Sequence, residues 1–301
     1  MMKMLANYIN GNYKVILLED GSKFRATGNN DFKPTFAESY DICITKYCDG
    51  ACGFCYEGCS TNGVHADLSL PFFDTIHPGT EIAINGNDLS HPELYDFLEK
   101  MKERKVIVNM TVNQKHFEKY FEILKSWIDN KLIWGLGISL VEPTSKFIMM
   151  AKQIPNAIIH VINGIVTVPQ LIKLADNNFK ILILGYKQLQ RGKEYYDNNS
   201  FFVGELQRDL NKVLFNEIIP QHWFKVISFD NLALEQLNVR ANVDSETWEK
   251  SYMGTDGQFS FYIDAVDSTF AKNSVAPANE RYPIMDNVDD MFNFIRSKDN
   301  D

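Results

Sequence analysis

The stretch Ile44–Cys59 reads ITKYCDGACGFCYEGC and carries four of the five cysteines of this 301-residue chain. The fifth, Cys43, lies directly before it. A secreted disulfide scaffold would instead spread an even number of cysteines along a short chain. Thiols crowded into one short segment indicate a metal site, because thiolates bind zinc and iron–sulfur clusters. The segment also follows the first apolar run of an alternating strand–helix pattern, so it predicts where in the fold the metal would lie.

The spacing of these cysteines separates two kinds of metal site. Structural zinc usually takes four ligands as two pairs that are well separated in sequence, and the sequence has no second Cys or His pair at a distance. A cubane iron–sulfur cluster can be held by one compact loop. Three ligands, Cys48, Cys52 and Cys55, would leave one iron open for a substrate. Cys52, Cys55 and Cys59 form an alternative triplet, whereas Cys43 lies in an apolar run and is expected to be a buried, inert thiol.

The order Cys48-x3-Cys52-x2-Cys55, with aromatic Phe54 before the last cysteine, resembles the defining motif of radical S-adenosylmethionine (radical SAM) enzymes. The resemblance implies a [4Fe–4S] cluster whose fourth iron is chelated by the amino and carboxylate groups of SAM. Reductive cleavage of SAM would give a 5′-deoxyadenosyl radical that abstracts hydrogen from the substrate. It also implies an electron donor such as flavodoxin or ferredoxin. The reaction outcome and the catalytic side chains stay unknown at this stage.

The resemblance covers roughly residues 39–190 and implies a set of SAM-binding residues. Phe54 would border the adenine, the segment after the second strand would hold the methionine amino group, and residues after later strands would contact ribose and adenine. The implied SAM-binding residues are Phe54, Asn85, Gly86, Asn87, Asp88, Asn113, Ser139 and Gly185. Several have ordinary structural interpretations as well. Asn113 could be a helix N-cap, Ser139 a satisfied strand-end serine, and Gly86 and Gly185 could simply turn the chain.

Six short apolar runs alternate with segments of helical periodicity from residue 39 onward. They span residues 39–45, 80–85, 105–112, 132–140, 156–163 and 179–185. Near-continuous apolar strands alternating with amphipathic helices predict a parallel sheet covered by helices. The pattern favours an α/β fold, a partial (β/α)6 barrel of the radical SAM type, although a doubly wound open sheet has much the same signature. In both folds ligands lie beyond the carboxyl ends of the strands, where the cysteine loop falls.

Two flanks complete the predicted organisation. Residues 1–34 are expected to form a β-hairpin or short meander, because Asn10-Gly11 and Asp20-Gly21 are strong hairpin-turn signals. Residues 35–200 form the predicted core, and residues 201–301 an α+β extension packed on it, with a strand in HWFKVISF and a terminal hairpin. No cysteine follows Cys59. Since an auxiliary cluster would need further cysteines, one cluster is expected.

Composition limits the possible functions. The net charge is −9, which disfavours but does not exclude a nucleic-acid substrate. No run approaches the roughly 18 apolar residues of a membrane span, and the N-terminus lacks the features of a secretory signal, so a cytoplasmic location is expected. The expected substrate is an unidentified peptide or small molecule. His160 interrupts an apolar run, and it is expected either to line the barrel or to contact the substrate. The alternative function is a non-catalytic binding protein whose loop is stapled by zinc or a cluster.

Overall fold

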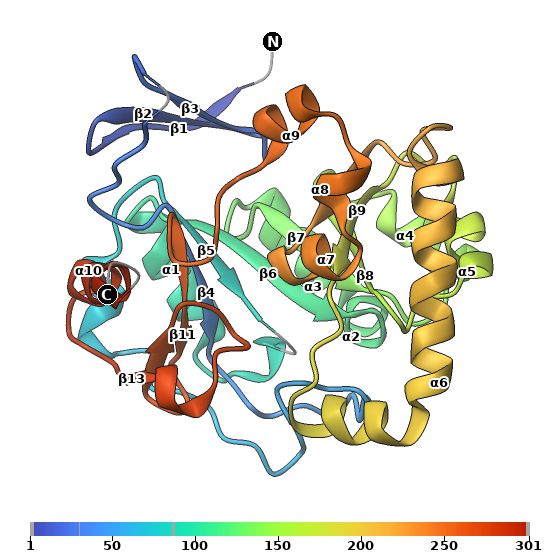
Figure 1. The fold of residues 1–301 in the computed structure, drawn as a ribbon. Helices are drawn as coiled ribbons and strands as arrows, with labels where there is room; N and C mark the ends of the chain where they lie inside the picture. Colours follow the sequence, from blue (N-terminus) through green and yellow to red (C-terminus); the bar gives the residue numbers. More distant parts are fainter. Residues whose placement is uncertain (1–2, 30, 86–87, 299–301) are drawn as a thin grey trace.

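The computed structural model describes residues 3–29, 31–85 and 88–298. Its centre is a ten-stranded sheet in the order β10-β9-β8-β7-β6-β5-β4-β11-β12-β13 (Figure 1). From β10 to β11 all neighbouring strands are parallel, and β12 and β13 continue the sheet in the antiparallel sense. The fold is therefore mixed α/β with a large parallel sheet, as predicted.

The six apolar runs all form strands of this sheet. They are β4 (Ser39–Cys43), β5 (Glu81–Ile84), β6 (Ile107–Asn113), β7 (Gly135–Ser139), β8 (Ala157–Ile162) and β9 (Lys180–Leu184). At the edges lie β10 (Val226–Phe229), β11 (Ser260–Asp264), β12 (Thr269–Ala271) and β13 (Tyr282–Pro283). The sheet thus extends the predicted six strands on both sides with strands from the C-terminal third. The boundary predicted near residue 200 lies in α6 (Gln190–Val213), beside a kink at Asn199 where the backbone leaves the helical conformation.

Helices cover the outer face of the sheet. In chain order the helices of the described residues are α1 (Leu94–Glu103), α2 (Gln114–Lys119), α3 (Phe121–Asp129), α4 (Ser145–Ala151), α5 (Val168–Leu174), α6, α7 (Asn231–Gln236), α8 (Val239–Asn242), α9 (Ser245–Ser251) and α10 (Val288–Lys298). Of these, α9 buries no side chain and does not belong to the cover. Outward strand residues such as Ile42, Ile84 and Ile138 are fully buried beneath this layer. Because side chains alternate across a strand, one apolar face per strand suffices to form the core. Among the described residues no helix is long and apolar enough to cross a membrane.

An antiparallel three-stranded sheet forms the N-terminal region, in agreement with the predicted meander (Figure 1). It consists of β1 (Met4–Asn10), β2 (Tyr13–Leu18) and β3 (Lys23–Ala26). Arg25 and Lys23 of β3 bind the fully buried Glu38, which precedes β4, at 2.7 and 3.5 Å. Lys23 also binds Glu81 at 2.7 Å. This small sheet therefore covers the amino ends of β4 and β5, opposite the ends where the cysteine loop lies.

Glu38 holds this junction together, so its replacement should destabilise the protein. Its carboxylate accepts hydrogen bonds from Tyr13 and Arg25 in a buried setting. We expect Glu38→Gln to lower the free energy of unfolding by about 1.5–3 kcal/mol, because hydrogen bonds to charged groups are lost. Urea denaturation measures this. In Glu19→Gln, which removes a pair with the exposed Lys3, the loss should stay below about 1 kcal/mol; equal losses in both variants would contradict the role of Glu38.

Candidate functional site

The cysteine loop leaves the carboxyl end of β4 and returns beside its own start. Backbone hydrogen bonds join Lys46 to Val64, Cys48 to Ser60, and Ala66 to Ile44. At Gly63 an added Cβ would lie only 1.9 Å from the Lys46 carbonyl oxygen, so only glycine allows the two segments to approach this closely. The loop is therefore a fixed structure at the position predicted for a ligand site in a parallel sheet.

Three cysteines of the loop are accessible, and two cysteines are not. Cys48, Cys52 and Cys55 are half-buried, whereas Cys43 and Cys59 are buried, and all five are free thiols. Burial raises the pKa of the Cys52 thiol, and nearby Cys55 and Cys48 raise it further. A Cβ added at Gly50 would lie 3.2 Å from the Cys48 sulfur and 3.9 Å from that of Cys52. Cys48 and Cys52 thus lie close together around Gly50, whereas the Cys55 thiol is hydrogen-bonded to the thiol of Cys59. Three accessible thiols in one loop are a donor set that suits an iron–sulfur cluster.

Asn113 connects this loop to the end of β6. Its side-chain oxygen accepts a hydrogen bond from the backbone of Lys115 and caps α2, as one interpretation of the sequence had it. Its amide nitrogen donates to the Cys52 sulfur at 3.7 Å. A capping role and a place beside the cysteines are therefore compatible. Under the same loop, buried His116 of α2 bonds the carboxylate of Asp49.

Arg191, at the start of α6, holds the far side of the loop. Its guanidinium donates to the carbonyl oxygens of Cys52, Gly58 and Cys59 at 3.1, 3.2 and 2.7 Å. Sequence reasoning missed this residue, because it is more than 130 positions away from the loop and belongs to no local motif. Phe54 lies on the same side, with its ring edge-to-face against Tyr195 at 6.0 Å.

A cavity of about 240 Å³ lies between the cysteine loop and the carboxyl ends of β6, β7 and β8. Three residues predicted to bind SAM line it, namely Phe54, Asn113 and Ser139, together with Cys52. Lys115 and Gln170 add polar groups that the sequence did not point to, and Ile162 and Val166 add apolar surface. This mixture could accommodate a ligand with an aromatic ring, hydroxyls and charges next to the thiols.

The other predicted SAM contacts are placed differently. Gly86 and Asn87 lie outside the described residues. Asn85 directly follows β5, where its backbone N–H bonds Ile42 of β4, and Asp88 begins a short 3-10 helix. Gly185 does not line the cavity: a Cβ there would lie 2.5 Å from Leu232 of α7, so close helix packing accounts for the glycine. A role for these residues in SAM binding stays a prediction.

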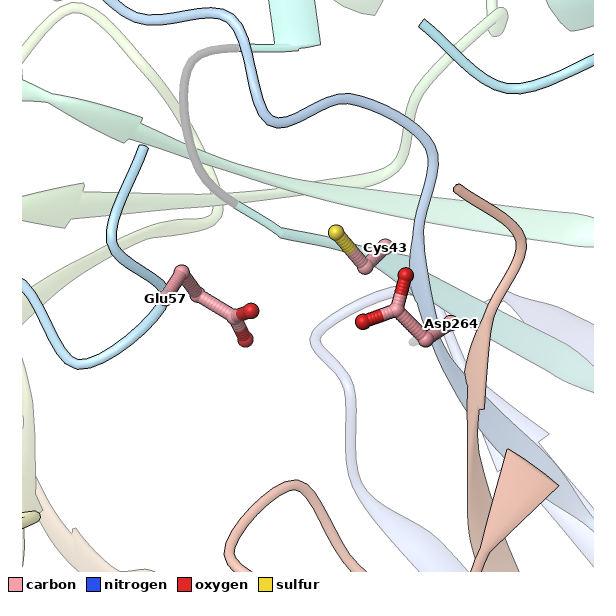
Figure 2. Close-up of side chains that lie close together, drawn as sticks. All are labelled: Cys43, Glu57 and Asp264. Atoms are coloured by element: carbon pink, nitrogen blue, oxygen red, sulfur yellow. The ribbon is translucent and has the colours of Figure 1, made fainter. Parts of the chain in front are cut away.

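A second cluster of polar side chains lies at the ends of β4 and β11. Figure 2 shows Cys43 and Asp264, which are register partners, facing Glu57 of the cysteine loop. Their ligand atoms lie within 4.8 Å of one another, a grouping that could hold a cation. The Lys46 ammonium already lies 2.7 Å from both carboxylates. The acidic pair is therefore compensated by the chain itself, and it ties the cysteine loop to the C-terminal strand.

His160 lines the cavity from β8, as one interpretation of the sequence proposed. Burial lowers its pKa from 6.5 to about 4. The unfolded chain then binds a proton near pH 6.5 that the folded chain binds only near pH 4, so stability falls as the pH drops through this window. We expect wild type to lose roughly 1–2 kcal/mol more than His160→Gln between pH 7 and pH 5. Urea denaturation at both pH values measures this; equal losses would contradict a His160 that stays neutral in the folded chain.

Comparison with known proteins gives structural neighbours only. No protein-family model matches the chain, and no curated protein matches its sequence. The structure is similar to that of Streptococcus suis SuiB bound to precursor peptide SuiA, with 13% identity and a TM-score of 0.56, over 90% of this chain and 83% of that chain. The structure is also similar to that of SuiB bound to S-adenosylmethionine, with 14% identity and a TM-score of 0.55, over 83% of this chain and 64% of that chain. A third SuiB structure has 16% identity and a TM-score of 0.50, over 79% of this chain and 60% of that chain.

These matches define the class of fold. The chain has a partial α/β barrel of the radical SAM type. Its structural neighbour SuiB is a radical SAM enzyme, and the fold predicted from the cysteine motif is therefore confirmed. The chain spans between 60% and 83% of the length of the SuiB chains. At this low identity the comparison supports the fold, and the chemistry must be argued from the residues of this chain.

Proposed function

We propose that this protein is a radical SAM enzyme that cleaves SAM reductively at a [4Fe–4S] cluster to make a 5′-deoxyadenosyl radical. The observation that carries the proposal is the group of accessible thiols, Cys48, Cys52 and Cys55, beside a cavity at the carboxyl ends of parallel strands. The likeness to SuiB bound to SAM supports it independently. A cluster on these three thiols would supply the electron for SAM cleavage and would leave one iron for SAM.

Each part of the chain has a role in this proposal. Cys48, Cys52 and Cys55 hold the cluster, and Asn113 and Arg191 keep the loop in place by bonding Cys52 at its sulfur and at its carbonyl. Phe54 and Ser139 line the space for the adenosine part of SAM, where Ser139 can bond a ribose hydroxyl. Exclusion of bulk water from this cavity by the bound ligands would protect a reactive intermediate from side reactions.

The substrate is the less defined part of the proposal. SuiB was crystallised with a precursor peptide, and a peptide substrate is therefore our first choice here, ahead of a small metabolite. The abstracted hydrogen would pass to the deoxyadenosyl group and leave the radical on the substrate. An electron donor such as flavodoxin or ferredoxin would be needed to reduce the cluster.

Anaerobic reconstitution with iron and sulfide, followed by EPR of the reduced protein with and without SAM, tests this function. We expect a [4Fe–4S]⁺ signal that changes when SAM is added. A colourless protein that binds one zinc tightly would overturn the proposal and would favour a binding protein with a stapled loop.

A further inference from the structure

The inner face of the barrel is hollow. Outward side chains of the central strands are almost completely buried, whereas inward ones such as Ala83, Thr111, His160 and Leu182 are only half-buried. Small β-barrels normally fill their interior with side chains. Asn109 and His160 fill the space above Gly135 and Gly137, but the half-buried side chains show that the rest of this face is reached by solvent. Asn113, Ser139 and His160 share this face and line the cavity beside the cysteines, which connects the interior to the proposed SAM site.

Asp41 is an unusual residue in this interior. It lies on β4, a central strand paired with β5 and β11, yet its side chain is exposed. Its register partners on the same face are Ala83 and Tyr262. Within the described residues no hydrogen bond or ion pair joins the Asp41 side chain to another group. Surrounding protein raises the pKa of this carboxyl to about 6. Asp41 is thus a carboxyl that solvent reaches, that protein surrounds, and that has no hydrogen-bond or ion-pair partner among the described residues.

The groups around Asp41 do not compensate its charge. Asp230 and Asp256 lie close enough to raise its pKa further. Asp230 accepts hydrogen bonds from the backbone of Gly185 and Ala233, and Asp256 accepts from the amides of Asn231 and Asn273, at 2.5 to 2.8 Å. These neutral donors stabilise the carboxylates without removing their charge.

Lys187 is the one nearby cation among the described residues that favours an ionised Asp41. Its ammonium donates to Ser274 at 2.9 Å and lies 4.1 Å from the centre of the Tyr56 ring, and it makes no ion pair with Asp41 within 4.0 Å. Asp41, Asp230 and Asp256 thus contribute three carboxylates against the one ammonium of Lys187, so the charge that acts on Asp41 is net negative. A region of this charge attracts a positive group. A divalent metal is a poorer occupant, because it needs several oxygen ligands at short distance.

We propose that the hollow interior is the substrate site and that Asp41 binds a cationic group of the substrate, an alkylammonium or a guanidinium. This inference rests on the proposed function for its chemistry, because a cation held at Asp41 would place the substrate in the same interior as the SAM cavity. Asp41 is thus a substrate-binding residue that orients the substrate toward the radical. The charge favours substrates with a basic group over neutral and acidic ones.

Binding of matched probes tests the inference on the reconstituted protein. The probes are N-acetyl-arginine methylamide and its neutral isostere N-acetyl-citrulline methylamide, measured by ligand-observed NMR titration. The same titration is made with the lysine and norleucine amides. We expect wild type to bind at least one cation roughly tenfold or more tightly than its neutral partner. Asp41→Asn should abolish this preference, and Asp41→Glu should keep most of it. The control Asp267→Asn, at an exposed carboxylate, should leave it unchanged.

Two outcomes overturn the inference: wild type shows no preference for either cation, or the preference survives in Asp41→Asn. The EPR response to SAM, recorded on the same samples, separates this inference from the proposed function. We expect Asp41→Asn to retain a cluster signal that changes with SAM, which also shows that the variant is folded. A cation preference without any SAM response in wild type would leave the interior site standing and remove the radical chemistry. The reverse result would remove only the role of Asp41.

Discussion

Replacing Cys52 with alanine is expected to abolish cluster binding and SAM cleavage. The Cys52 sulfur lies beside the cavity and accepts from Asn113, and its loss would leave two thiols for a cluster that needs three. Even the outer partners of metal ligands typically cost 10–100-fold when mutated, so loss of a ligand should lower 5′-deoxyadenosine formation by more than about 100-fold. Iron and sulfide content and the rate of 5′-deoxyadenosine formation measure this. An unchanged rate would contradict the proposed function.

Serine variants of the flanking cysteines decide which triplet binds the cluster. Cys48 is accessible, whereas Cys59 is buried. If Cys48, Cys52 and Cys55 are the ligands, Cys48→Ser should lose iron and Cys59→Ser should retain it. The opposite result would select the alternative triplet with Cys59. Circular dichroism of each variant distinguishes the loss of a ligand from the loss of the fold.

The strands of the core could be predicted because local sequence and tertiary environment agree there. Residues such as Ile82 and Ile84 are apolar, extended and covered by helices, so a short apolar run predicted each strand. The cysteine loop could be placed for the same reason, since it directly follows β4. Asn113 shows that two interpretations of one residue need not compete, because its two side-chain atoms face different partners.

Other parts of the site depend on contacts between residues far apart in the chain. Arg191 reaches the carbonyls of the cysteine loop, and Asp41 has unusual surroundings only because β5 and β11 flank it. A single Arg or Asp carries no periodic or spacing signal, so sequence patterns could not find these residues. The position of β11 beside β4 belongs to the same group, because strands more than 200 residues apart pair there. The interior of the barrel is thus the part of this protein that only the structure reveals.

Replacing Lys46 with methionine is expected to destabilise the protein by about 3–5 kcal/mol, the cost of breaking a buried ion pair on one side. The Lys46 ammonium lies between Glu57, whose side chain is 11% exposed, and Asp264, which is 2% exposed. Although burial alone lowers the pKa of Lys46, Cys43, Glu57 and Asp264 raise it above its ordinary value. Methionine keeps the apolar stem but leaves two carboxylates facing each other without a cation. Urea denaturation of the protein without iron measures the loss.

The same substitution should also weaken cluster binding, because Lys46 and Glu57 flank the three cysteine ligands in sequence. Iron per chain after reconstitution should fall in Lys46→Met and recover in Lys46→Arg, which restores the charge. Asp267, which is 65% exposed and 4.0 Å from Lys46, provides the control: Asp267→Asn should cost less than about 1 kcal/mol. If Lys46→Met costs no more than this control, the buried ion pair does not hold the loop.

A double variant separates two effects of losing Lys46: the lost attraction to the carboxylates, and the repulsion between Glu57 and Asp264 that the lysine had screened. In Lys46→Met with Glu57→Gln, only Asp264 remains charged at this position, and Tyr262 still donates to it at 3.2 Å. We therefore expect the double variant to be more stable than Lys46→Met alone, with a coupling of about 1–3 kcal/mol, as is usual for residues of one charged network. Additive losses would mean that Glu57 and Asp264 do not repel each other, and that the loop is held by its backbone ladder and by Arg191 instead.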